Sequence, residues 1–112
     1  MRLMVVEDNP ADLRLLSEYM RGDRGTTVDG VDSVAAAVSR LRESDYDVVL
    51  LDLGLPDSTG LSALRSLSSQ NPEVPIVVLT GDADRTLPLQ ALQQGAEDFL
   101  VKGELSEELV PR

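Results

Sequence analysis

The chain of 112 residues contains no cysteine, no histidine and no tryptophan. Without cysteine it has neither a disulfide scaffold nor a thiolate metal or redox site. Without histidine it has no imidazole to act as a base, a metal ligand or a phosphocarrier. One phenylalanine and two tyrosines predict a core that is almost wholly aliphatic. Any chemistry must therefore depend on carboxylates, hydroxyls, lysine and arginine.

Positive charge is also scarce, since 10 Lys and Arg face 20 Asp and Glu, which gives a net charge of −10. An acidic domain repels phosphate backbones, so we expect no direct contact with nucleic acid. No apolar run approaches the roughly 20 residues that span a bilayer. Glu7 and Asp8 interrupt any signal-peptide pattern at once. We therefore expect a single domain in the cytoplasm that does not associate with a membrane.

Short apolar runs alternate with segments of helical periodicity. Unbroken runs of about four residues are typical of strands buried on both faces, as in parallel sheets. Such runs are Leu3–Val6, Val48–Leu51, Ile76–Leu79 and Phe99–Val101, and Thr26–Val28 is a weaker candidate for an edge strand. The helical signals between them are the caps Asn9 and Ser33, the repeat of Leu61, Leu64 and Leu67, and the segment Thr86–Gln94, which Gly95 ends. This order predicts an α/β fold of three layers, with one parallel five-stranded sheet between helices.

Polar residues follow four of the predicted strands. Glu7 and Asp8 follow the first strand, Asp52 the third, Thr80 the fourth and Lys102 the fifth. Because parallel strands end at one edge of a sheet, where ligands bind, we expect these side chains to converge. Each alone has a plainer explanation, since an acid at a strand end is often a cap or turn residue and a lysine is normally a surface charge. Their joint occurrence, with Lys102 the only lysine, favours a site.

Three clustered carboxylates repel one another, and a divalent cation relieves that repulsion. Hard oxygen donors without histidine or cysteine favour Mg²⁺, with Mn²⁺ as a substitute. Mg²⁺ usually takes one or two carboxylates besides water and a substrate phosphate, so a carboxylate oxygen remains to attack phosphorus. Such an attack produces an acyl phosphate. The cation, Lys102 and Thr80 can each stabilise one oxygen of the transferred group.

Four segments together resemble the motifs of response-regulator receiver domains from bacterial two-component systems, including the chemotaxis regulators. They are Met4–Asn9, Asp47–Asp57, Pro75–Gly81 and Gly95–Lys102, with Gly60 between the second and third. The resemblance covers nearly the whole chain. It implies a flavodoxin-like fold with strand order 2-1-3-4-5.

The resemblance also implies a role for each matching residue. Asp52 corresponds to the phosphoacceptor and Lys102 to the ammonium that binds the phosphoryl group. The implied metal ligands are Asp8, Asp52 and the backbone carbonyl of Gly54, with Glu7 acting mainly through water. Thr80 corresponds to the hydroxyl that moves toward the phosphoryl group, and Gly81 leaves space beside it. Phe99 matches an aromatic side chain that turns inward on activation, although simple core packing explains it equally well.

A receiver domain is a signalling switch rather than an enzyme, although it catalyses its own phosphorylation and dephosphorylation. Because the chain has no histidine, the phosphoryl donor must be external. The candidates are a phosphohistidine of a histidine kinase or of a histidine phosphotransfer protein, and a small acyl phosphate. The implied partner on the other side is an output domain or an effector protein. Neither the pathway nor the output is written in this sequence.

The C-terminal segment departs from the family pattern. Gly103 stands where many receivers have a cis-proline, so the loop after Lys102 stays open. Only Glu104–Val110 remains for the fifth helix before Pro111, so we expect that helix to be truncated. The apolar face left bare in this way, beside the helix that Asn9 caps, favours a homodimer or a rearranged terminal segment that covers it. Leu109–Arg112 resembles the residues that a thrombin-cleavable tag leaves behind. This interpretation places the receiver at residues 1–108, and a genuine short terminus is the alternative.

Three other functions compete with this interpretation. Phosphatases of the haloacid dehalogenase type carry a second Asp two residues after the nucleophile, where this chain has Gly54. A flavodoxin-like FMN binder needs a hydroxyl- and glycine-rich loop after the first strand, where Glu7 and Asp8 would repel the flavin phosphate. A degenerate receiver that serves only as a binding module would lack part of the site, which is complete here.

Overall fold

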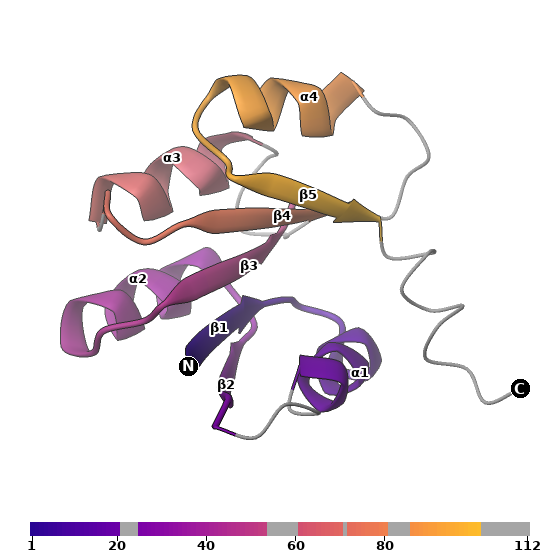
Figure 1. The fold of residues 1–112 in the computed structure, drawn as a ribbon, viewed down its shortest axis with the longest axis vertical. Helices are drawn as coiled ribbons and strands as arrows, with labels where there is room; N and C mark the ends of the chain where they lie inside the picture. The colour runs from indigo at the N-terminus through magenta and orange to yellow at the C-terminus, as the bar shows by residue number, and fades with distance from the viewer. Residues whose placement is uncertain (21–24, 54–60, 71, 81–85, 102–112) are drawn as a thin grey trace, which may run out of the picture.

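A computed structural model describes residues 1–20, 25–53, 61–70, 72–80 and 86–101 (Figure 1). The strands are β1 (Arg2–Val6), β2 (Thr27–Val31), β3 (Val48–Asp52), β4 (Ile76–Thr80) and β5 (Asp98–Val101). The helices are α1 (Pro10–Met20), α2 (Val34–Glu43), α3 (Leu61–Gln70) and α4 (Thr86–Gln93). All neighbouring strands pair in parallel, in the order β2-β1-β3-β4-β5. The predicted α/β fold and strand order are confirmed.

Each face of the sheet carries its own hydrophobic cluster. Leu3 and Val5 of β1 pack with Leu16 of α1 on one face. Met4 and Val6 point the other way, into the cluster that also contains buried residues of α2, α3 and α4. Figure 1 shows α1 on one side of the sheet and α2 on the other. Burial on both faces is the physical reason why the strands are unbroken apolar runs.

Two helices begin at the residues that the sequence indicates. The side-chain oxygen of Asn9 accepts hydrogen bonds from the backbone N–H groups of Ala11 (3.0 Å) and Asp12 (3.2 Å) at the start of α1. The Ser33 hydroxyl oxygen accepts the N–H of Ala36 (3.0 Å) at the start of α2. Each bond satisfies a backbone donor that the helix itself leaves unpaired. Both predicted caps are confirmed.

The second strand departs most from its prediction, because it continues to Val31 instead of ending at Val28. Asp29 and Gly30 interrupt its apolar pattern. A Cβ atom on Gly30 would lie 2.8 Å from Cδ1 of Leu13, so glycine at this position lets α1 approach β2 closely. Glycine also has the predicted role after α4, where Gly95 has φ +110°. Helix α4 itself ends at Gln93, one residue before the predicted end.

Several predictions fall on residues 102–112, outside the described residues. These are the truncated fifth helix, the loop at Lys102 and Gly103, and the origin of Leu109–Arg112. The domain boundary at residue 108 likewise stays a prediction. Within the described residues, no helix is both long and apolar enough to cross a membrane.

Candidate functional site

Strand pairing determines which polar residues meet at the carboxyl edge of the sheet. Val6 of β1 pairs with Leu51 of β3, so the residues that follow them, Glu7 and Asp52, lie side by side. Asp52 pairs in turn with Leu79 of β4, and Thr80 is the next residue along β4. Asp52 ends the central strand of the five, and both Asp52 and Thr80 are buried. The register of three neighbouring strands thus brings Glu7, Asp52 and Thr80 to one edge.

The acidic residues form a compact group of oxygen donors. One carboxylate oxygen from each of Glu7, Asp8 and Asp52 lies within 4.8 Å of the other two. Asp8 is exposed, whereas Glu7 is only 1% exposed and Asp52 6%. Like charges this close favour a cation between them, and an all-oxygen set suits a hard divalent ion. The residues present therefore fit the magnesium that the sequence predicts.

Backbone hydrogen bonds hold the group in place. The N–H of Glu7 donates to the carbonyl of Val31 at 3.0 Å, which extends the pairing of β1 with β2 past the last strand residue. The N–H of Leu53 donates to the carbonyl of Leu79 at 3.1 Å, which does the same for β3 and β4. The N–H of Asn9 donates to Oε1 of Glu7 at 3.1 Å. Glu7 and Asp52 therefore lie at the hydrogen-bonded ends of their strands, and Asp8 lies in the bend that follows β1.

The remaining predicted site residues are placed unevenly. Thr80 pairs with Val101 of β5, the residue before Lys102, so β5 ends beside the threonine. Lys102 itself, Gly54 and Gly81 lie outside the described residues. Phe99 of β5 is partly buried and packs against the hydrophobic cluster beneath α2, α3 and α4. The inward turn of Phe99 on activation stays a prediction.

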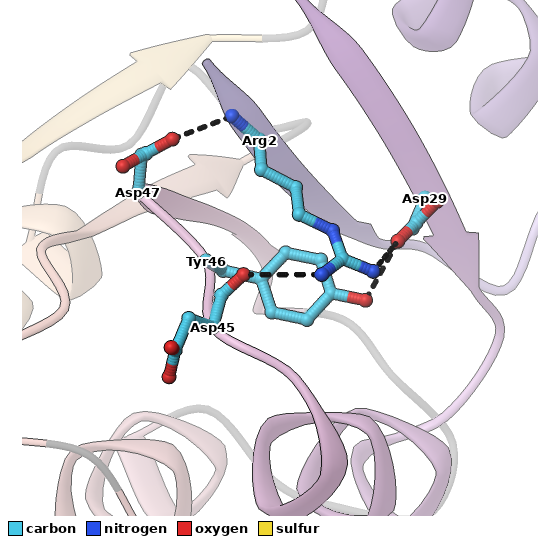
Figure 2. Close-up of polar contacts among 5 residues, drawn as sticks. All are labelled: Arg2, Asp29, Asp45, Tyr46 and Asp47. Atoms are coloured by element: carbon cyan, nitrogen blue, oxygen red, sulfur yellow. Dashed lines mark hydrogen bonds and ion pairs between the residues drawn. The ribbon is translucent and has the colours of Figure 1, made fainter.

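A second polar cluster, which the sequence patterns did not predict, lies at the opposite edge of the sheet (Figure 2). The Arg2 guanidinium lies 4.7 Å from the centroid of the Tyr46 ring and pairs with the Asp29 carboxylate at 3.3 Å. The Tyr46 hydroxyl donates to the same Asp29 oxygen at 2.7 Å. Asp47 accepts the backbone N–H of Arg2 at 2.6 Å. The one available signal was the Asp-Tyr-Asp segment at residues 45–47, directly before an apolar strand.

The contacts of this cluster shift two pKa values in opposite directions. The hydrogen bond from Tyr46 is the main cause that lowers the pKa of Asp29, with a further contribution from Arg2. Burial is the main cause that raises the pKa of Tyr46, and the bond to Asp29 adds to it. Both shifts stabilise the protonation states found near neutral pH, a carboxylate beside a neutral phenol.

Comparison with known proteins agrees with this fold. The family model of the response regulator receiver domain matches residues 3–112. Two-component response regulator PhoP of Pseudomonas aeruginosa is 38% identical over 112 residues, which make up 100% of this chain and 49% of PhoP. The solved RcsB response regulator of Salmonella typhimurium superposes with a TM-score of 0.87 at 20% identity, over 97% of this chain and 55% of RcsB. A Burkholderia pseudomallei response regulator, solved with a phosphorylated aspartic acid, calcium ion and citrate, has a TM-score of 0.79 at 24% identity, over 96% and 71% of the two chains.

The chain therefore belongs to the response regulator receiver domains, the signalling switches of two-component systems. It is homologous to the receiver part of PhoP-type regulators. It spans about half the length of the curated relatives it matches, 49% of one and 50% of another. As a family, response regulators act between histidine kinases and output domains.

Proposed function

We propose that this receiver accepts a phosphoryl group on Asp52 from a phosphohistidine of a histidine kinase or a histidine phosphotransfer protein. The observation that carries the proposal is the position of Asp52, a buried carboxylate at the end of the central strand, beside two further carboxylates. In the transfer, a carboxylate oxygen of Asp52 bonds to phosphorus while the bond from phosphorus to the imidazole nitrogen breaks. The imidazole leaves, and an aspartyl phosphate remains.

Glu7, Asp8 and Asp52 would hold the cation, together with the backbone carbonyl of Gly54 that the family resemblance implies. Mg²⁺, or Mn²⁺ in its place, would supply positive charge against the oxygens of the transferred group. Carboxylates within 4.8 Å of one another support this assignment. The Burkholderia pseudomallei relative, solved with a calcium ion and a phosphorylated aspartic acid, supports the same chemistry.

The other family roles are assigned by position in the sequence and along the strands. Thr80 at the end of β4 would donate a hydrogen bond from its hydroxyl to the phosphoryl group, with Gly81 leaving room beside it. Lys102, directly after β5, would bind a phosphoryl oxygen with its ammonium group. Phe99 would follow the movement of Thr80 only if it leaves its present packing against the core. These groups would also catalyse dephosphorylation, so the domain resets itself.

The phosphorylated state would control an output domain or an effector protein. RcsB interacts with DNA, and this chain corresponds to only 55% of RcsB. We assign no nucleic-acid contact to the receiver itself, because its net charge of −10 repels phosphates. Contact with DNA would belong to other parts of a full-length regulator. A homodimer through the face of α1 stays a prediction.

The acceptor can be tested by intact-mass measurement after incubation with acetyl phosphate and Mg²⁺. We expect the wild type to gain one phosphoryl group and Asp52→Asn to gain none. Asp47→Asn is the matched control, because Asp47 lies just before the other end of the same strand and bonds the backbone of Arg2. It should be phosphorylated like the wild type. Phosphorylation of Asp52→Asn at the wild-type rate would show that another residue is the acceptor.

A further inference from the structure

Asn9 is bonded to both the acidic site and helix α1. Its backbone N–H donates to Oε1 of Glu7 at 3.1 Å. Its side-chain oxygen accepts the N–H groups of Ala11 and Asp12, and its backbone carbonyl accepts the N–H of Leu13 at 2.9 Å. A single residue therefore makes the first bonds of the helix and holds one oxygen of a buried carboxylate.

The two sets of bonds depend on each other through the backbone of Asn9. The side-chain bonds to Ala11 and Asp12 restrain the backbone of Asn9, as the side chain of a capping residue does. The backbone conformation determines where its N–H points, and the N–H contacts Glu7. Loss of the cap frees the first turn of α1 and with it the direction of the N–H. The carboxylate of Glu7 could then adopt orientations other than the one that it has beside Asp8 and Asp52.

We propose that Asn9 is a positioning residue for the cation site, acting on the metal through Glu7. The inference rests on the proposed function, because it assumes that Glu7, Asp8 and Asp52 hold the cation. Groups that orient metal ligands by hydrogen bonds commonly change metal affinity by about 10- to 100-fold when they are removed. Asn9→Ala removes the cap while leaving the peptide N–H in the chain, so we expect the lower end of that range.

A cap that only stabilises α1 would affect folding but not metal binding, and Ser33 separates the two roles. Ser33 caps α2 through the same kind of bond, at 3.0 Å to the N–H of Ala36. Ser33→Ala should therefore destabilise the fold about as much as Asn9→Ala in Mg²⁺-free buffer. Glu7 takes its bond from Asn9, however, so Ser33→Ala should leave the affinity for Mg²⁺ unchanged.

The test is a Mg²⁺ titration by calorimetry of the wild type, Asn9→Ala, Asn9→Ser and Ser33→Ala. We expect about a tenfold weaker Kd for Asn9→Ala, with Asn9→Ser within about threefold of the wild type because serine also caps. Asn9→Ala with the wild-type Kd, or Ser33→Ala weakened as much as Asn9→Ala, would overturn the role of Asn9 while leaving the cation site intact. No Mg²⁺ binding by the wild type would instead overturn the proposed site, and the role of Asn9 with it.

Discussion

The two edges of the sheet differ in how their charged side chains are arranged. Where β1 and β3 end, three carboxylates gather within 4.8 Å. Where the same strands begin, Arg2 and Tyr46 pair with the carboxylate of Asp29 in the neighbouring strand β2 (Figure 2). Opposite charges in contact stabilise the fold by themselves, whereas like charges in contact cost stability until a ligand neutralises them. We therefore expect the amino edge to stabilise the fold and the carboxyl edge to favour a bound cation.

The largest expected effect on folding lies at Tyr46, the centre of the amino edge. Tyr46 is only 6% exposed and belongs to the larger core cluster. Tyr46→Ala should lower the free energy of unfolding by about 3–5 kcal/mol, measured by urea denaturation, because it leaves a cavity and removes the donor to Asp29.

Tyr19 on α1 is the matched control, since its side chain is exposed. Tyr19→Ala should change the free energy of unfolding by less than about 1 kcal/mol. Similar losses for the two variants would mean that the amino edge has no special weight in stability.

Removal of one negative charge should have opposite signs at the two edges. Asp52→Asn should stabilise the Mg²⁺-free protein, because it relieves repulsion from Glu7 and Asp8. Asp29→Asn should destabilise it, because the ion pair with Arg2 is lost. Thermal melting in Mg²⁺-free buffer measures both changes, and a stability loss in both variants would contradict the contrast.

The stabilisation that Mg²⁺ gives should differ between the same two variants. At roughly ten times its Kd, Mg²⁺ should stabilise the wild type by about 1.4 kcal/mol, because it binds the native state. Asp29→Asn should keep this increase and Asp52→Asn should lose most of it. A melting temperature indifferent to millimolar Mg²⁺ in all three proteins would count against the cation site.

Arg2 should contribute less than Tyr46, because its side chain is 44% exposed and solvent screens its charge. Arg2→Ala should cost about 0.5–1 kcal/mol of unfolding free energy, mostly from its contact with the Tyr46 ring. Arg14 pairs with Glu18 one helical turn away on α1, and both side chains are largely exposed. Arg14→Ala should cost no more than about 0.5 kcal/mol of unfolding free energy. A loss for Arg14→Ala as large as that for Arg2→Ala would show that the aromatic contact of Arg2 adds nothing.

The smallest effect is the pH dependence of the amino edge. The pKa of Asp29 is lowered in the folded state, so its contribution is present above an ordinary pKa of 3.8 and is lost as pH falls through the folded value. The pKa of Tyr46 is raised, so its contribution is present below pH 10.0 and is lost as pH rises above it. Urea midpoints across pH 2–12 should fall at both ends, less steeply in Tyr46→Phe than in the wild type. Parallel wild-type and Tyr46→Phe curves would exclude this cause.

Local patterns in the sequence were sufficient to predict the parallel sheet and four of its five strands, whereas β2 was predicted to end too early. The strand order came from the family resemblance. Runs buried on both faces have a distinct composition, and the caps at Asn9 and Ser33 act within one turn of their own helices. The chemistry of the carboxyl edge could be inferred for the same reason. Parallel strands all end on one side, so residues after the strands converge whatever their distance in sequence.

Tertiary structure alone decided the features that depend on contacts between distant segments. Strand β2 continues through Gly30 because it pairs there with Val5 of β1, and Leu13 of α1 lies close to the glycine, which no period within β2 reveals. Arg2 and Asp29 lie 27 residues apart, and they pair only because β1 and β2 are neighbours in the sheet. Tyr46 becomes a buried donor to Asp29 only when the start of β3 packs beside them. Local periodicity records which side of an element is buried, whereas the partner across the contact is chosen by the packing of the whole chain.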